Sequence, residues 1–335
     1  MKRLAGMIAA ALFFAQTAAA EPDRWRAAGW QTDFSRSLVE FSEIIAGGPP
    51  RDGIPAIDDP IFEPAHSLTE LGPHEPLIRL EVDGEVRGYP LRILTWHEIV
   101  NDEIAGLPVA VTYCPLCNSA IVFDRRIDTG EALEFGVSGL LRHSDMIMYD
   151  RQSDSWWQQF TGEGVVGEHA GKRLKMIPSR VVGFTQLLEA DPDAQVLVPQ
   201  NPRARPYGQN PYVGYDSRSM PYPLYTGDLP SNLDPMSRVV VVNLGDEIRA
   251  VTLSHLRERG RVEMDAVVLT WSEGVNSALD SRMIEGGREV GAVDAVHEDD
   301  GSPLVHDITF AFVVHAFHPG QTVLTEEGPV ELTSR

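Results

Sequence analysis

Alternating hydrophobic and polar positions predict a β-hairpin early in the chain. Residues 77–82 alternate in the manner of a strand with one buried face. Asp83-Gly84 follows, a dipeptide that favours the tight turn of a hairpin, and residues 86–89 resume the strand pattern. The pattern therefore predicts antiparallel pairing in this region.

More short strands are predicted through the first half, with one helix among them. Residues 109–113 and 120–124 are rich in β-branched and aromatic side chains, which is typical of buried strands. Residues 92–101 carry apolar side chains at the spacing of a short helix. Three further strands are expected near residues 134–137, 146–150 and 156–157.

Residues 191–237 differ in composition from the rest of the chain. They hold nine of the 24 prolines and five of the eight tyrosines, namely Tyr207, Tyr212, Tyr215, Tyr222 and Tyr225. A proline-rich segment of this length in a compact protein is a covering loop or an interdomain connection. Its aromatic side chains indicate that it packs on another surface, and they offer a contact for a small molecule or a protein partner.

The second half repeats a motif of the first. Residues 270–278 align without a gap on residues 112–120, and both copies begin with Thr-aromatic and end with Asn-Ser-Ala. Ser272 and Val275 occupy the positions at which the first copy has its cysteines. The match indicates an internal duplication. It also predicts that the backbone forms the same turn without the thiols.

These patterns together predict a β-rich α+β protein built from two related halves, with mostly antiparallel sheets. The first twenty residues are excluded from the fold. The predicted divisions are a first β-rich unit at residues 21–190, the connecting or covering loop at 191–237 and a degenerate second unit at 238–335.

The first twenty residues have the pattern of a cleaved export signal. Lys2 and Arg3 precede an apolar run, and small residues lead up to Ala20. No cysteine stands near Ala20 to carry a lipid anchor. We therefore expect cleavage near Ala20 and export to the periplasm.

Charge excludes some classes of partner. The chain carries 28 basic and 49 acidic residues, a formal charge of −21, and the excess is spread along the sequence. Nucleic acid is not expected as a partner, since phosphate binding needs a basic face. No segment approaches the roughly 18 consecutive apolar residues of a membrane span. No glycine-rich phosphate loop occurs, so no nucleotide cofactor is expected.

The two cysteines, Cys114 and Cys117, are three positions apart. A disulfide between them would close a very small ring and stabilise little, because the stabilisation grows with loop length. A strand, a Cys-Pro-Leu-Cys turn and a second strand resemble the knuckle that holds zinc or iron in ribbon-like sites. Such a turn supplies two thiolates, so the remaining ligands must come from elsewhere in the chain.

His97 is the first candidate for a third ligand, because the element that carries it immediately precedes the cysteine strand. Further candidates are His143, Met146, His315 and His318. Soft sulfur ligands favour copper, whereas cysteine with histidine also suits zinc. The sequence therefore leaves copper and zinc open as the suspected metal.

Thiol–disulfide chemistry is the alternative, since a Cys-x-x-Cys pair in an oxidising compartment is a natural redox couple. A thioredoxin-like motif opens a helix, however, and the apolar run after Cys117 predicts a strand. A non-catalytic binding module is a third possibility. The residues do not decide whether the protein is an enzyme.

Six motifs run in order along the chain and resemble those of the bacterial DUF3179 family, a family of unknown function. They are Gly53 to Pro60, Tyr89 to Leu91, His97 to Asp102, Val111 to Cys117, Gly136 to Leu141 and Met148 to Arg151. The resemblance implies no reaction, cofactor or partner. Besides His97 and the cysteines, it places these residues in characteristic segments of the family: Asn101, Asp102, Ser138, Gly139, Asp145, Asp150 and Arg151.

The sequence therefore predicts a periplasmic metal-binding protein with a Cys-x-x-Cys site, with copper handling or metalloredox chemistry as its specific forms.

Overall fold

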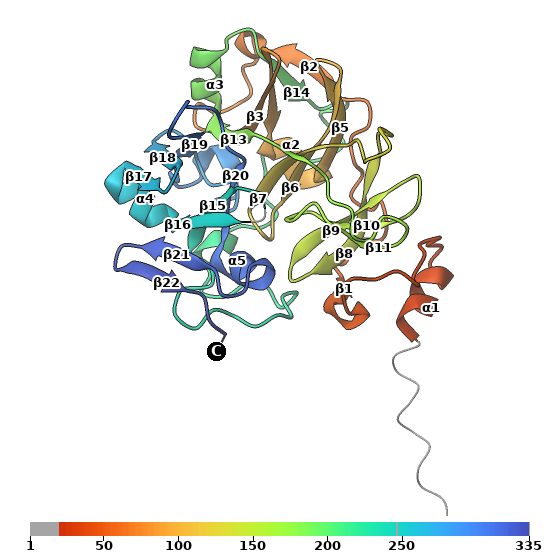
Figure 1. Cartoon of the computed structure of the whole chain (residues 1–335). Coiled ribbons are helices and arrows are strands. Elements are labelled where there is room, and N and C mark those ends of the chain that lie inside the picture. Colours follow the sequence, from red (N-terminus) through yellow and green to blue (C-terminus); the bar gives the residue numbers. More distant parts are fainter. Residues whose placement is uncertain (1–19, 246, 335) are drawn as a thin grey trace, which may run out of the picture.

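A computed structural model describes residues 20–245 and 247–334 and shows a β-rich protein with 40 % strand and 15 % helix. The expected export signal lies outside these residues, apart from Ala20. Within the described chain the strands form five sheets, mostly antiparallel, in a five-bladed, propeller-like arrangement (Figure 1). None of the helices in these two ranges is long and apolar enough to cross a membrane.

The predicted hairpin forms at the expected place. Strands β3 (Pro76–Val82) and β4 (Glu85–Pro90) pair antiparallel, with Val82 opposite Glu85. Asp83 and Gly84 both have positive φ, 49° and 82°, as a two-residue turn of this hand requires. The sheet is completed by β13 (Ser179–Gly183), β14 (Gln195–Val198) and β2 (Ile61–Pro64).

A second sheet carries the cysteine turn. It has the order β12-β7-β6-β5, with β5 at Ile99–Ile104, β6 at Leu107–Cys114, β7 at Ser119–Asp124 and β12 at Met176–Ile177. All six residues of β7 are buried, because β6 and β7 contribute side chains to two hydrophobic clusters, one on each face. The prediction of buried strands around the cysteines is confirmed.

The helix predicted at 92–101 is shorter than expected. Helix α2 covers Leu91–His97, and Glu98 follows with φ of +60°. This left-handed residue ends the helix and redirects the chain into β5. The apolar residues after Glu98 therefore belong to a strand, which explains why their helical spacing was misleading.

The third sheet, on the right in Figure 1, contains the other predicted strands of the first half. Its order is β1-β8-β9-β10-β11. The bounds are Ile44–Ala46 for β1, Phe135–Arg142 for β8, Asp145–Asp150 for β9, Trp156–Gln158 for β10 and Gly164–Val166 for β11. Helix α1 (Ala20–Ala27) packs Trp25 edge-on against Trp156 of this sheet, with ring centroids 4.8 Å apart.

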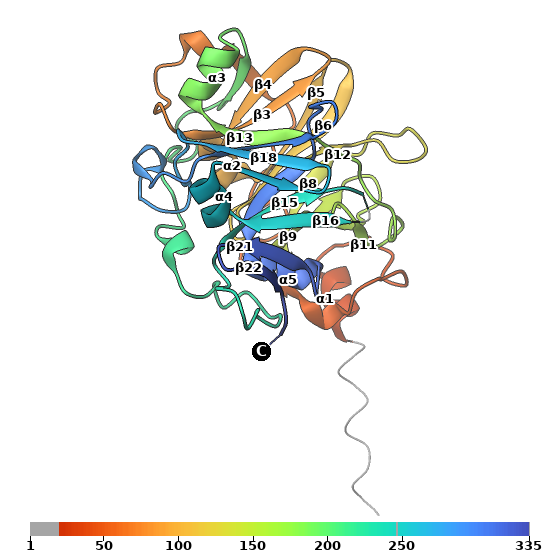
Figure 2. The ribbon, with the colours of Figure 1, turned by 60° about the vertical axis from the view of Figure 1, so that its left-hand side comes forward.

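The second half supplies the remaining two sheets, seen at the left of Figure 1 and at the centre of Figure 2. One has the order β20-β15-β16-β21-β22 and the other β17-β18-β19. The strands are β15 (Arg238–Asn243), β16 (Ile248–Thr252), β17 (Arg261–Met264), β18 (Val267–Ser272), β19 (Ala292–His297), β20 (His306–Phe310), β21 (Thr322–Thr325) and β22 (Gly328–Glu331).

Two of the five sheets have corresponding strand directions. In β13-β3-β4-β14 the pairings are antiparallel, antiparallel and parallel, and β20-β15-β16-β21 has the same series. The helices fall at corresponding places, α2 and α4 (Leu253–Arg259) after the hairpins, and α3 (Phe184–Ala190) and α5 (Ala311–Phe317) before the parallel strands. Each half thus has the same succession of elements around its hairpin sheet.

The sister turn predicted after Ser272 does not form, and that prediction was wrong. Ser272 of β18 pairs with Ala292 of β19, whereas Cys114 pairs with Ser119. Residues 273–291 make a long excursion in place of a four-residue turn. Residues 270–278 and 112–120 therefore have similar sequences but different backbone structures. Their similarity gives no evidence that the cysteine turn can form without thiols.

The proline- and tyrosine-rich segment at 191–237 contains strand β14 and a single 3₁₀ turn at Tyr215–Ser217. The middle of the segment, residues 210–215, contacts the cysteine turn and the excursion at 273–291. Backbone amides of Asn210 and Gly214 donate to the carbonyls of Arg282 and Asp280 in that excursion. This part of the second half therefore holds the segment in place.

Candidate functional site

The cysteine turn is a tight connection between β6 and β7. Cys114 ends β6, and its partner across the hairpin is Ser119, which begins β7. The amide of Cys117 donates to the carbonyl of Cys114 at 3.2 Å, and Asn118 has φ of +52°, which closes the turn. Both cysteines are free thiols and both are buried. The turn thus brings two sulfur atoms together inside the core.

Asp145 is the third member of this group. One carboxylate oxygen of Asp145 and the sulfur atoms of Cys114 and Cys117 all lie within 4.8 Å of one another. Asp145 Oδ2 accepts hydrogen bonds from Gln158 Nε2 at 2.5 Å and from the amide of Phe160 at 2.9 Å. Asp145 Oδ1 is buried and has no hydrogen-bond partner among the described residues. The group therefore has unused ligand capacity.

Burial sets the protonation of these three groups. It raises the pKa of Cys114, and it raises the pKa of Cys117 well above the ordinary value of a thiol. Burial also raises the pKa of Asp145 to about 6, against the hydrogen bonds from Phe160 and Gln158. Each negative charge is costly here because the groups are buried away from the solvent that would compensate it. A bound cation would supply that compensation.

Glu98 is a functional candidate that the sequence interpretation missed. It lies at the left-handed junction of α2 and β5, and its side chain is buried. Burial, followed by the nearby charge of Asp145, raises the pKa of Glu98 to about 8. Glu98 and Cys114 line the same cavity. The sequence offers one signal for it, an acidic residue among the apolar residues of the predicted helix at 92–101.

Tyrosines of the 191–237 segment cover the cysteine turn. Tyr215 is buried and donates its hydroxyl to the carbonyl of Leu116 at 2.9 Å. The ring of Tyr222 stacks on Tyr215 with centroids 4.3 Å apart, and Tyr212 lines the cavity at Cys114 and Glu98. Tyr215 and Tyr222 thus cover one side of the cysteine turn.

His97, predicted as the third ligand, does not join the cysteine group. Its Nδ1 is 2.7 Å from the carbonyl oxygen of Pro55, and its Nε2 is 2.8 Å from the hydroxyl of Tyr207. Both ring nitrogen atoms are therefore engaged away from the thiols. The expectation from chain order failed because Glu98, one residue later, is the side chain that the turn after α2 directs to the cysteine cavity.

The four additional ligand candidates have different environments. Met146 shares the hydrophobic cluster of the cysteines and lines the cavity at Cys114. His143, in the turn before Asp145, has its Nε2 3.5 Å from Glu43 Oε2. His315 approaches Ser334 Oγ at 3.2 Å, and the His318 ring lies 6.0 Å from the ring of Phe160. Among the described residues, none of these histidines belongs to the cysteine group.

Residues in the other sequence motifs support the backbone around the site. Asn101 braces β8, donating to the carbonyl of Phe135 at 2.8 Å and accepting from its amide at 2.9 Å. Asp102 accepts hydrogen bonds from Arg87 and Tyr89. These are positioning contacts in the interior, and neither residue approaches the thiols as a ligand.

Four further motif residues also make structural contacts. Ser138 and Gly139 form a β-bulge in β8, where Ser138 Oγ accepts from the amide of Leu140. Asp150 accepts from the indole nitrogen of Trp157 at 2.8 Å, and Arg151 pairs with Asp58 at 2.8 Å. The bulge is relevant to the site because Gly139 lies on the wall of the cavity at Cys114.

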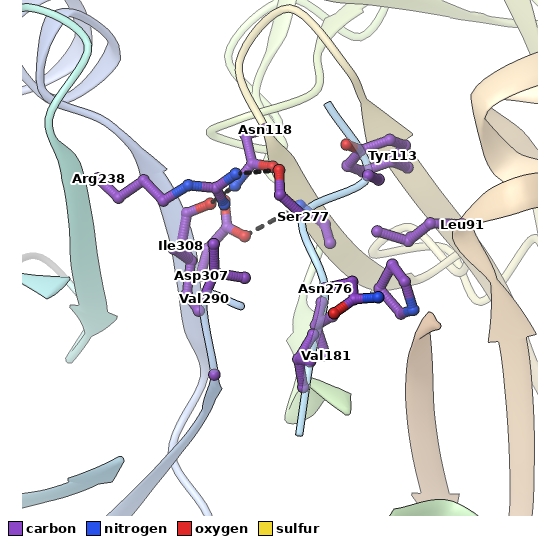
Figure 3. A pocket seen from close by; sticks show the side chains of 15 residues that line it. Leu91, Tyr113, Asn118, Val181, Arg238, Asn276, Ser277, Val290, Asp307 and Ile308 are labelled. Carbon is purple, nitrogen blue, oxygen red and sulfur yellow. Dashed lines mark hydrogen bonds between the residues drawn. The ribbon is translucent and has the colours of Figure 1, made fainter. Parts of the chain in front are cut away.

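A separate polar chamber lies near the interface of the two halves (Figure 3). Its volume is about 30 Å³, and Tyr113, Arg238, Ser277 and Asp307 contribute polar groups to its lining. Arg238 donates to Ser277 Oγ at 2.7 Å, one of the contacts drawn in Figure 3. Tyr113 points to the face of β6 opposite Cys114, since successive strand residues alternate. The chamber is therefore distinct from the cysteine site.

One protein family matches most of the chain. The family described as "Protein of unknown function (DUF3179)" matches residues 51–321. The chain belongs to the DUF3179 family. Searches of curated proteins and of solved structures each gave no match. Membership of DUF3179 confirms the resemblance seen in the sequence motifs, and the match includes Glu98, Cys114, Cys117 and Asp145.

Proposed function

We propose that this DUF3179 protein binds a transition-metal ion through Cys114, Cys117 and Asp145. The supporting observation is the convergence of two thiols and a carboxylate oxygen within 4.8 Å in a buried site. Burial without a cation raises the pKa of all three groups. A metal ion would stabilise their deprotonated forms, and binding would release protons.

The donor set favours zinc over copper. Thiolates bind both metals, but a carboxylate oxygen is a harder ligand that suits Zn²⁺ better than Cu(I). Met146 is the nearest feature in favour of copper, because it lies in the same cluster as the cysteines. Gln158 and the Phe160 amide would orient Asp145 through their hydrogen bonds to Oδ2, as hydrogen-bonded groups around metal ligands commonly do.

Metal analysis of the purified protein tests this proposal. Protein from cells supplied with zinc, copper and iron is expected to contain close to one metal ion per chain. Cys117→Ser and Asp145→Asn should each lower that content strongly, with the far-ultraviolet circular dichroism unchanged. Asp307→Asn removes another buried acid and is the matched control. Metal-free wild-type protein that also fails to bind added Zn²⁺ would refute the proposal.

Thiol–disulfide exchange is the alternative, and the environment of the thiols supports it less. Catalytic cysteines are usually accessible and have a lowered pKa, because the thiolate is the nucleophile. Cys114 and Cys117 are both buried and their pKa is raised. The strand β7 follows directly, so no helix N-terminus favours the thiolate. A redox role would require the covering segment to move first.

We also infer that the protein is exported and that its halves arose by duplication. Export rests on the charge and hydrophobicity of residues 1–20. The matching strand directions of β13-β3-β4-β14 and β20-β15-β16-β21 support the duplication. Fractionation of the native host tests the first inference, which fails if the full-length chain stays in the cytoplasm.

A further inference from the structure

A narrow cavity connects the cysteine site with the surface. Its volume is about 70 Å³, several times the ~10–15 Å³ that one water molecule needs. Buried Glu98 and Cys114 lie in its wall, together with exposed Pro49 and half-buried Tyr212. Aliphatic side chains provide most of the remaining surface, including Leu116, Val137, Leu140, Leu141 and Met146. A small molecule therefore has a route to the thiol of Cys114.

Glu98 is the acidic side chain in the wall of this cavity. The residue is buried, and burial and the nearby charge of Asp145 raise its pKa, with no hydrogen bond from the described residues among the causes. A buried carboxyl group without a partner is costly, and its left-handed backbone adds strain. Such features cluster at functional sites, where the missing partner is a ligand.

The charges restrict which ligands the cavity can accept. Two thiolates and one carboxylate give three negative charges around a divalent cation, and Glu98 lies beside them. Among the residues that the structure describes, no Lys, Arg or His lines the cavity wall. An anion would therefore meet a negative site with nothing to compensate its charge. A small neutral molecule with one hydrogen-bond donor and little polar surface suits the wall better.

We propose that this cavity is a ligand subsite, in which a small neutral molecule binds the metal beside Cys114 and donates a hydrogen bond to Glu98. The inference rests on the proposed metal site. Three protein ligands leave one position of a tetrahedral zinc site open, and an open position distinguishes reactive zinc sites from structural ones. The site would then bind an exogenous ligand instead of being closed by a fourth side chain.

Spectroscopy of the Co²⁺-loaded full-length protein tests the metal site and the ligand subsite separately. A thiolate-to-cobalt absorption band reports the metal site itself. Imidazole at pH 8, which is small, mostly neutral and carries an N–H donor, should then shift the visible cobalt bands with saturation. Azide, as the anionic probe, and 2-phenylimidazole, which is too large for the cavity, should leave those bands unchanged.

The variant Glu98→Gln examines the role assigned to the carboxylate. It should weaken imidazole binding about tenfold, the effect of losing a hydrogen bond to a charged group, and change Co²⁺ affinity by less than that. Glu103→Gln alters an exposed glutamate on the following strand, β5, and should behave like the wild type. If Glu98→Gln does not fold, the wild type still tests the subsite, because imidazole should shift the cobalt bands whereas azide and 2-phenylimidazole should not.

The outcomes are distinguishable. A missing thiolate-to-cobalt band would refute the metal site, and the subsite with it. A normal band that imidazole does not affect would refute the subsite alone. A large loss of Co²⁺ affinity in Glu98→Gln would also refute it, because Glu98 would then be the fourth ligand of a closed site.

Discussion

At the scale of single residues, three buried acids have a pKa raised by burial. Asp145 and Glu98 lie at the cysteine site, and Asp307 lies at the polar chamber (Figure 3). Asp307 Oδ1 accepts from the amide of Ala120 at 2.9 Å, but Oδ2 is buried without a partner among the described residues. Burial therefore raises the pKa of all three acids, and of these Glu98 lines the cavity at Cys114.

Asp307 gives a prediction about pH. Burial raises the pKa of Asp307 to about 6, above its ordinary value near 3.9. Below about pH 4 the carboxyl is protonated in both folded and unfolded chains. Between about pH 4 and 6 the carboxyl ionises in the unfolded chain but stays mostly protonated in the folded one, so over this range the group lowers the free energy of unfolding by up to about 3 kcal/mol.

Urea unfolding of the wild type and of Asp307→Asn between pH 4 and 7 measures this effect. Asn can keep the contact to Ala120 and does not ionise. The stability of the variant relative to the wild type should therefore rise with pH across this window. A difference that stays constant with pH would contradict a raised pKa for Asp307.

Tyr215 gives a second prediction at this scale. Its hydroxyl is buried and donates to the carbonyl of Leu116 inside the cysteine turn. Tyr215→Phe should lower the free energy of unfolding by about 1–2 kcal/mol, because the carbonyl loses its partner while the ring packing remains. Tyr225→Phe, whose hydroxyl contacts the exposed carbonyl of Asp228, should cost less. Equal losses in the two variants would show that the turn does not depend on Tyr215.

At the scale of elements, the β-bulge in β8 fixes one wall of the cavity. Gly139 has φ of +74°, and a Cβ atom there would lie 2.1 Å from the carbonyl oxygen of Pro49. Gly139→Ala should therefore destabilise the fold by about 2 kcal/mol or more, from backbone strain and the clash with another main-chain atom.

Gly130→Ala is the matched control for the bulge. Gly130 has a similar φ of +83°, but no atom lies within 4 Å of its added Cβ. Its substitution should cost only the left-handed conformation, about 1 kcal/mol. Thermal unfolding measures both variants. Equal shifts in melting temperature would mean that the contact of Gly139 with Pro49 does not constrain the bulge.

The sequence predicted these elements better than it predicted the site. Alternation located β3 and β4, and runs of β-branched and aromatic residues located β6 and β7, because these patterns follow directly from burial of one or both strand faces. The site depends on contacts between residues far apart in the chain. Asp145 was identified through its motif but not as a ligand, and His97 was chosen by chain proximity. The left-handed Glu98 that redirects the chain leaves no mark in a hydrophobic pattern.

At the scale of the whole molecule, the second half holds the cover of the cysteine site. Asp216, next to Tyr215, is buried and accepts from Ser277 Oγ at 2.5 Å. Its carboxylate also pairs with Arg238 at 2.8 Å and with Arg288 at 3.0 Å. Ser277 and Arg288 belong to the excursion at 273–291. Residues 273–291 thus help to hold the tyrosines over the thiols. We call the contacts of Asp216 with Ser277, Arg238 and Arg288 the clamp.

The clamp predicts that thiol accessibility depends on residues of the second half. Arg288 is partly exposed, and its guanidinium contacts Ser217 Oγ, the carbonyl of Asp216 and the Asp216 carboxylate. Arg288→Ala should loosen the covering segment without leaving a buried charge uncompensated, because Arg238 still pairs with Asp216. We expect alkylation of Cys114 and Cys117 by a maleimide too large for the cavity at Cys114 to become several-fold faster, since opening of the cover limits access.

Arg261→Ala is the control, because it removes an exposed arginine of the second half whose ion pair with Glu263 is distant in sequence from the clamp. Mass spectrometry of metal-free protein follows the labelling, so that a bound ion does not protect the thiols. Global unfolding would accelerate labelling in proportion to the loss of stability, and urea titration of both variants corrects for it. If the corrected rate for Arg288→Ala equals that of Arg261→Ala, the covering segment is held by its tyrosines alone and the excursion at 273–291 has no part in closing the site.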